Sequence, residues 1–346
     1  LAATAALTVP DLVTATSAVT VSFNTSRTPT ATLPAGPYLR VTLASLTATV
    51  AGGKLVGSFA FTRAVDATGT VEYVVAMTGV SAYLVASDPN PSLYNGQGAL
   101  ILRSDGVAGF LSGTASFGGD AVSASGSVLL QVNTTAGAID TTVEVGGKDI
   151  VVKLPAPVSG SIFTLSVSNL TLTIGNFVTI EGNLSFSDTV IGGVPVRVVA
   201  ASGLSVFLGQ GPAFLDTGAL NPLAMGVLLS GATLGLIEYT AGDGTKTYAL
   251  VASGTVSLIG VPGVVLTGTT SVRVNTTGQT VDQVIGIPGS TEPGVSVQFI
   301  DDPATTSVNE RDTIAFTVTG QVAFAGQELS GTFSFSRSGT DLVASV

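Results

Sequence analysis

The stretch Val132-Asn133-Thr134-Thr135 decides how the rest of the chain is read, because it returns as Val274-Asn275-Thr276-Thr277. A looser copy, Phe23-Asn24-Thr25-Ser26, lies near the start of the sequence. Neighbouring stretches return in the same order, at spacings of about 125 to 150 residues, which is an ordinary domain size. Repetition at long spacing is typical of one structural unit that is used several times. We therefore expect a tandem array of similar units.

Boundaries between the units are indicated by Leu-Pro pairs at residues 33–34 and 154–155. Proline lacks the amide that an inner strand needs for its ladder, so it favours the end of a strand. With the repeated landmarks, these pairs predict the closing strands of a preceding repeat, two complete repeats and the opening strands of a third. The predicted segments are residues 1–34, 35–155, 156–302 and 303–346.

The apolar pattern slips by one residue at the same place in two of the copies. Apolar residues alternate over residues 39–43 and again over residues 46–50, but in the opposite phase. Residues 163–167 and 170–174 show the same slip. A one-residue slip predicts a β-bulge or a strand that changes sheets. In the third copy, residues 314–324 keep one phase throughout, so no slip is expected there.

The composition favours strands throughout the chain. Thr, Val and Gly dominate, only 10% of residues are charged, and mean hydropathy is +0.58. Branched side chains suit a pleated surface, and short turns rich in Gly, Asp and Asn join successive runs. No window shows a helical period. We predict an all-β fold of tandem, antiparallel, sandwich-like or flattened-barrel units that are rich in Thr, Val and Gly.

The charge and the missing residue types exclude several classes of function. A net charge of −10 without a basic patch argues against nucleic-acid binding. The chain has no histidine and no cysteine, so it has neither a Ser-His-Asp triad nor a thiol nucleophile. We predict that the protein is not an enzyme and has no cofactor other than calcium.

One uncharged stretch, residues 217–237, is about long enough to cross a bilayer as a helix. Its counterpart in the preceding repeat, residues 100–111, contains Arg103 and Asp105. Equivalent stretches of a repeat share one fold, and charges inside a bilayer are costly. The sequence therefore predicts no membrane span.

Two kinds of site are candidates in the loops and at strand ends. Asp301, Asp302 and Asp312 offer hard oxygen ligands of the kind that Ca²⁺ prefers, although solvated turns are the favoured interpretation of each. Asn24, Asn133 and Asn275 each begin an Asn-x-Ser/Thr triplet, the acceptor sequence for N-linked glycans. The structural alternative is that each asparagine ends a strand.

The tandem β units, with their Ser-Gly-Thr openings and Val-Asn-Thr-Thr strands, resemble the repeat regions of very large bacterial surface and filament proteins of the adhesin-like type. Residues 248–277, 112–135 and 203–208 carry this resemblance. It implies an exported protein located outside the cell or on its surface.

We therefore expect a structural protein: a repeat segment of an extracellular filament, sheath or surface layer. Its expected partner is itself, through β-edges or apolar faces. The alternative is an adhesin stalk or a glycan-binding module that depends on Ca²⁺. Such a module would have a glycan as its partner.

Overall fold

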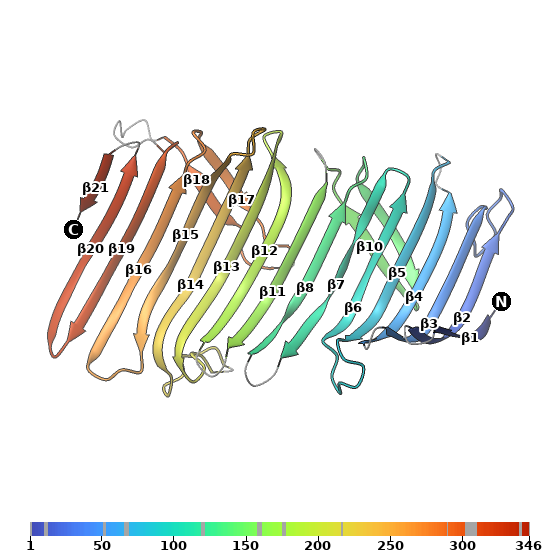
Figure 1. Cartoon of the computed structure of the whole chain (residues 1–346), viewed down its shortest axis with the longest axis horizontal. Helices are drawn as coiled ribbons and strands as arrows, with labels where there is room; N and C mark the ends of the chain where they lie inside the picture. Colours follow the sequence, from blue (N-terminus) through green and yellow to red (C-terminus); the bar gives the residue numbers. More distant parts are fainter. Residues whose placement is uncertain are drawn as a thin grey trace. The chain divides into compact units, whose positions relative to one another are not determined.

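The structure is a computed structural model, and it confirms an antiparallel all-β chain (Figure 1). It describes residues 2–9, 13–50, 53–65, 69–118, 122–157, 161–174, 178–215, 217–288, 290–301, 310–338 and 341–345. None of these residues lies in a helix. The chain divides into two compact units: residues 1–117 with 127–165, and residues 118–126 with 166–346.

Unit 1 is built on a meander of long strands. They are β1 (Ala2–Val9), β2 (Val13–Asn24), β3 (Tyr38–Val50), β4 (Gly53–Val65), β5 (Val71–Tyr83), β6 (Leu93–Arg103) and β7 (Gly106–Gly118). Each strand pairs antiparallel with the next one in the sequence. A separate hairpin, β9 (Ile139–Val145) and β10 (Lys148–Leu154), completes the unit. Strands β8 (Val122–Asn133) and β11 (Ile162–Ile174) each contain residues of both units.

Unit 2 follows the same plan. Its strands are β12 (Val178–Ile191), β13 (Val194–Gln210), β14 (Met225–Thr240), β15 (Lys246–Ile259), β16 (Val264–Asn275), β19 (Thr313–Phe324), β20 (Gln327–Ser338) and β21 (Asp341–Ser345). They pair in order, and β16 pairs directly with β19. The hairpin β17 (Val281–Ile285) and β18 (Val295–Phe299) leaves the sheet between them.

The order of elements recurs along the chain, whereas the two compact units have other bounds than the predicted repeats, which remain a prediction. Residues 35–155 hold six sheet strands, β3 to β8, followed by one hairpin, and residues 156–302 hold six more, β11 to β16, followed by another. Strands β2, β8 and β16 are each 12 residues long and end at an asparagine of the repeated stretch. The second layer of each unit is a two-stranded hairpin, which is smaller than the second sheet of a full sandwich.

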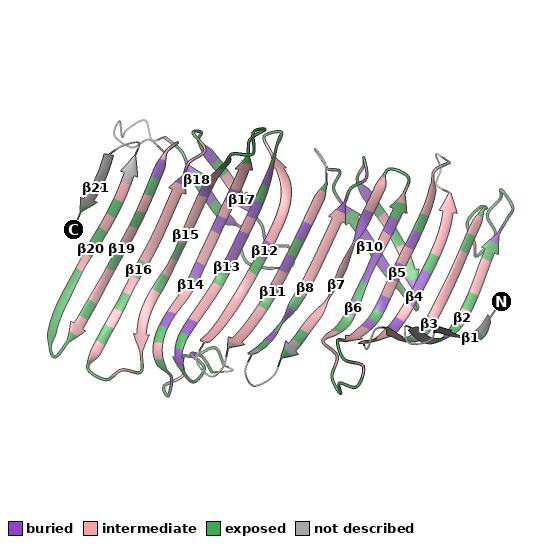
Figure 2. Ribbon diagram, in the orientation of Figure 1, coloured by how far each residue is buried: buried purple, intermediate pink, exposed green. Residues whose placement is uncertain are grey.

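Each hairpin covers part of one face of its own sheet. Ile139, Val145, Ile150, Val152 and Leu154 point from the first hairpin onto small residues of β4 to β7, such as Ala60, Ala76, Ala99 and Ala108. The second hairpin packs in the same way on β13 to β15. The hairpin residues that face the sheet are among the most buried of the molecule (Figure 2). Small side chains on the sheet allow the hairpin to approach closely.

The predicted phase slip is a β-bulge. Leu43 pairs with Phe59 and Leu46 pairs with Gly57, so β3 advances three residues while β4 advances two. Ser45 takes up the extra residue with a φ of 56°, and Asn169 has a φ of 52° at the equivalent point of β11. The extra residue in the bulge reverses the facing of the residues that follow it, and the one-residue slip in the apolar pattern reverses it again. The apolar residues before and after Ser45 therefore stay on one face of the sheet. As predicted, β19 pairs over residues 313–324 without a shift.

Candidate functional site

The repeated Val-Asn-Thr-Thr stretch ties each hairpin to the sheet. The Asn133 side chain is fully buried, and its Nδ2 donates to the carbonyl oxygens of Gly137 at 3.0 Å and Pro155 at 2.7 Å. The Gly137 carbonyl precedes the hairpin and the Pro155 carbonyl follows it. The Asn133 Oδ1 accepts from the amide and hydroxyl of Thr135. One side chain therefore closes the loop that contains the whole hairpin.

The other copies use the same geometry. Asn275 is also fully buried, and its Nδ2 donates to the carbonyls of Gln279 at 2.8 Å and Glu310 at 2.6 Å. Asn24 donates to the carbonyls of Thr28 and Pro34 across a loop that holds no hairpin. We call this arrangement the asparagine latch. It persists where the hairpin is missing, so it is a property of the strand end.

The first threonine of the stretch has a separate task. The Thr134 amide donates to the Val107 carbonyl, and the Thr134 hydroxyl accepts from the Val107 amide at 2.8 Å. Thr276 makes the equivalent pair of bonds with Tyr248. These contacts hold the end of one strand against the start of a neighbouring strand. Every polar residue of the repeated stretch is thus used inside the fold.

This geometry bears directly on the glycan-acceptor prediction for Asn24, Asn133 and Asn275. A sugar on Nδ2 would replace a hydrogen that is donated to a backbone carbonyl. Asn133 and Asn275 have no exposed surface, and Asn24 is 7% exposed. We therefore assign these three side chains a structural role.

The predicted calcium ligands are not gathered into a cluster in the part of the chain that the structure describes. The Asp301 carboxylate accepts from the Glu310 amide at 3.1 Å and pairs with the Arg311 guanidinium at 2.8 Å. Asp312 is half-buried and has contacts of its own. Asp302 lies outside the described residues. The contacts of Asp301 position the chain that returns from the second hairpin, and they do not require a metal.

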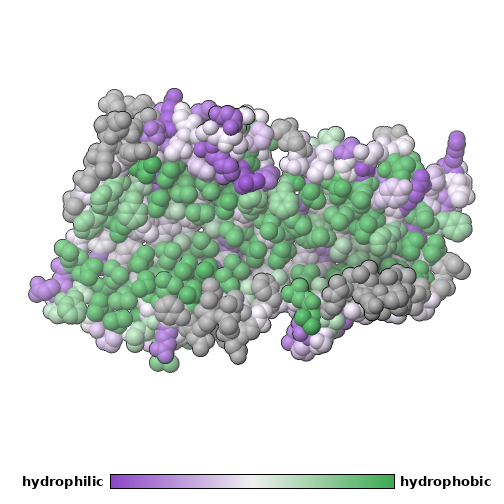
Figure 3. All heavy atoms as spheres, viewed as in Figure 1, coloured by the Kyte–Doolittle hydropathy of each residue, from purple (hydrophilic) through white to green (hydrophobic). Residues whose placement is uncertain are grey.

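A further candidate surface is the face of each unit's sheet that points away from its hairpin. We call it the open face. In unit 1, Val21, Val41, Phe61, Val75 and Leu100 are cross-strand neighbours on this face, from β2 to β6. In Figure 1 the hairpins lie behind the sheet strands, and Figure 3 shows apolar residues dominating the side toward the viewer. The open face is therefore a broad apolar surface.

Several large side chains on the open face are poorly covered. Phe23 is 64% exposed and Phe61 is 43% exposed in unit 1, and Phe335 is 52% exposed in unit 2. A Gly-x-Phe-x-Phe landmark, with Leu in place of the first Phe in its second copy, recurs at residues 57–61, 182–186 and 331–335. Its alternating apolar residues fit a core face by pattern. Within one chain, Phe59 is buried whereas Phe61, Phe333 and Phe335 are not.

A row of four charged side chains lies along the border of the open face of unit 2. Asp188, Arg197, Glu238 and Lys246 come from β12, β13, β14 and β15. Arg197 contacts Asp188 at 3.1 Å and Glu238 at 3.8 Å, and Lys246 contacts Glu238 at 2.8 Å. The four charges cancel in pairs. The apolar rows therefore end at a polar rim, an arrangement typical of interfaces.

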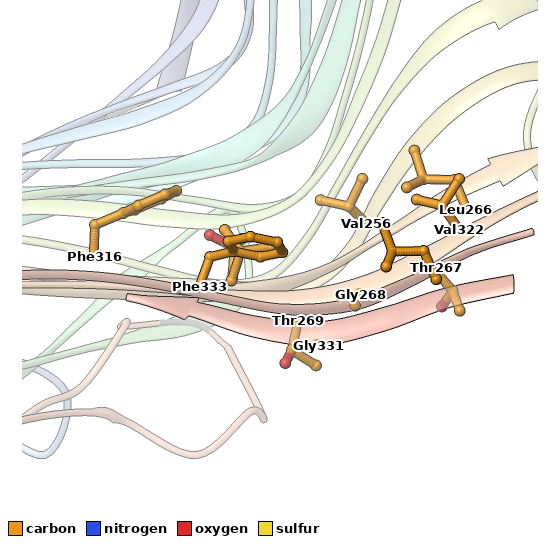
Figure 4. Close-up of a pocket in the computed structure, with 13 residues that line it drawn as sticks. Val256, Leu266, Thr267, Gly268, Thr269, Phe316, Val322, Gly331 and Phe333 are labelled. Carbon is orange, nitrogen blue, oxygen red and sulfur yellow. The ribbon is translucent and has the colours of Figure 1, made fainter. Parts of the chain in front are cut away.

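A groove crosses the open face of unit 2 where three glycines stand side by side. Gly268, Gly320 and Gly331 are in register on β16, β19 and β20. The groove has a volume of about 360 Å³, and Phe316 and Phe333 are among the residues that line it. Figure 4 shows both rings on the side of Val256, Leu266 and Val322, with Thr269 on the other side of the strands. We call this groove the glycine trough.

Sequence reasoning missed the glycine trough. One signal was present, since Gly331 opens the third Gly-x-Phe-x-Phe landmark. Its alignment with Gly268 depends on β16 pairing with β19 across a 37-residue excursion between Asn275 and Thr313 (313 − 275 − 1). Local pattern does not reveal that pairing.

The described residues contain no helix long and apolar enough to cross a membrane. They also contain no group of three or more metal-binding side chains. Comparison of the chain with known protein families, known proteins and solved structures finds no match.

Proposed function

We propose that this chain is a structural repeat segment of an extended assembly, such as a surface layer or filament, and that its open face packs against the open face of a second copy. The observation that carries the proposal is the uncovered apolar surface of each sheet. Monomeric proteins rarely leave contiguous apolar surface of more than about 300–600 Å² exposed. Burying one phenylalanine-sized side chain contributes about 1.5–3 kcal/mol.

Two features favour a second copy as the occupant. Rows of apolar side chains recur along each sheet, so two copies present matching ridges and grooves to each other. Asp188, Arg197, Glu238 and Lys246 at the border of the face in unit 2 are paired with one another, so a partner needs no charge to neutralise them. A structural role also agrees with the use of the repeated polar residues as internal ties.

Sedimentation equilibrium tests this proposal on matched double variants. Phe316 and Phe335 are cross-strand neighbours on the open face, and both are exposed. We expect Phe316→Ser with Phe335→Ser to weaken self-association by at least about tenfold. The control, Val151→Ser with Val284→Ser, removes two exposed apolar side chains from the hairpins and should leave the mass distribution unchanged.

An unassociated wild-type chain at all concentrations would overturn the proposal. So would equal effects of the two double variants, because they would show that exposed apolar side chains associate without regard to the face. Circular dichroism of each variant establishes that the sheet is intact.

A further inference from the structure

We propose that the glycine trough binds a single aliphatic chain, of the kind carried by a free fatty acid. The inference does not depend on self-association, because it rests on one groove within unit 2. Gly268, Gly320 and Gly331 form its floor, and their missing side chains leave the space above three neighbouring strands empty.

Three other glycines on the open face, Gly57, Gly96 and Gly254, lie under the protein's own side chains. A Cβ placed on Gly57 would lie 2.9 Å from Val80 Cγ2, and one placed on Gly96 would lie 2.9 Å from Val80 Cβ. In unit 2, a Cβ on Gly254 would lie 2.8 Å from Leu229 Cδ1. The molecule therefore shows which chemistry fits above an open-face glycine: the methyl and methylene groups of Val and Leu.

The trough is uncovered for a structural reason. Val80 reaches over its glycines from β5, whose pairing with β4 and with β6 contains bulges. The pairings of β16 with β19 and of β19 with β20 contain none. A Cβ on Gly268 or Gly320 would come close only to backbone atoms, and one on Gly331 would meet nothing within 4 Å. No side chain of the described residues fills this place.

The lining identifies the ligand class. Phe316, Val318 and Phe333 stand on one side of the glycines, and Leu266, Val322 and Leu329 stand on the other. No charged residue lines the trough, and its polar lining residues are threonines. A groove of about 360 Å³ lies within the range of about 300–1,000 Å³ for small-molecule sites. Because the trough crosses the strands in a line, an extended chain fits it better than a ring system.

Titration with cis-parinaric acid, a fluorescent polyene fatty acid, tests the inference on the whole chain. We expect saturable fluorescence enhancement with one site per chain. Gly331→Leu places an aliphatic side chain in the trough, where an added Cβ meets nothing within 4 Å, and should weaken binding by at least about tenfold. Gly331→Ala should give a smaller loss. Gly242→Leu, in the β14–β15 turn where a Cβ also meets nothing, is the matched control and should bind like the wild type.

Non-saturable enhancement, or equal binding by Gly331→Leu and Gly242→Leu, would overturn the inference. Light scattering on the same samples separates this result from the fate of the proposed function. If Gly331→Leu lowers the mass while the wild type takes up no parinaric acid, the trough holds side chains of a second copy, and the aliphatic-ligand inference is wrong. A monomeric wild type that binds the probe would overturn only the self-association proposal.

Discussion

The side-chain amide of Asn133 donates to the carbonyl of Pro155, 22 residues further along the chain, over a distance of 2.7 Å. Its second hydrogen reaches the carbonyl of Gly137. The hairpin between these carbonyls packs on the sheet through Val145 and Val152, which have no exposed surface. The latch thus fixes both ends of a layer that apolar contact holds in place. The same latch at Asn24 closes a loop without a hairpin, so the asparagine at the ends of β2, β8 and β16 closes whatever loop follows the strand.

Asn133→Asp should destabilise the chain more than any exposed Asn→Asp change. The carboxylate cannot donate, so the Gly137 and Pro155 carbonyl oxygens lose their partner and face a buried negative charge. Each unsatisfied buried group costs about 1–3 kcal/mol, and we expect a loss of about 2–4 kcal/mol in the free energy of unfolding. Urea denaturation measures it, with Asn90→Asp on an exposed loop as the control. Equal midpoints for the two variants would show that the latch is dispensable.

The bulge at Ser45 predicts two opposite effects at one position. Ser45 has a φ of 56°, which glycine adopts freely and branched residues adopt only with strain. We expect Ser45→Gly to be neutral or to stabilise the chain by up to about 1 kcal/mol, and Ser45→Val to destabilise it by about 1–2 kcal/mol. Thermal unfolding followed by circular dichroism compares them. A stabilising valine would contradict the left-handed conformation.

Tyr239 reports on the packing under the second hairpin. Burial raises the pKa of its hydroxyl above the ordinary value of 10.0. The folded state holds the Tyr239 hydroxyl in its neutral form more firmly than the unfolded state does. The stability that comes from the neutral buried tyrosine is therefore complete below pH 10.0, and it is lost as the pH rises through the folded-state pKa. Tyrosinate absorbance should show one late-titrating group that is absent from Tyr239→Phe. A difference spectrum that titrates at or below the ordinary value would exclude this burial.

The sequence predicted the bulge because its cause is local: the alternation that ends at Leu43 resumes out of phase at Leu46. Asn133 and Asn275, which the sequence matched by their repeated stretch, make equivalent hydrogen bonds in the structure. The latch could not be foreseen, because the Pro155 carbonyl is a backbone atom whose position depends on the hairpin. The sequence also did not reveal that the second layer of each unit is only a two-stranded hairpin. Apolar alternation in β19, at Phe316 for example, predicts a covered face but does not say whether the cover belongs to the same chain.

The central claim, that the open face is covered by another copy, is tested most directly with single spin labels. The chain contains no cysteine, so a label at Leu329→Cys on the open face or at Val151→Cys on the first hairpin is unique. Both parent residues are exposed, at 69% and 56%. For the Leu329→Cys label, dipolar spectroscopy should give a defined intermolecular distance, and the amplitude of that signal should rise with protein concentration. For the Val151→Cys label it should give only a featureless background. A featureless background at both positions, or the same distance signal at both, would contradict the account.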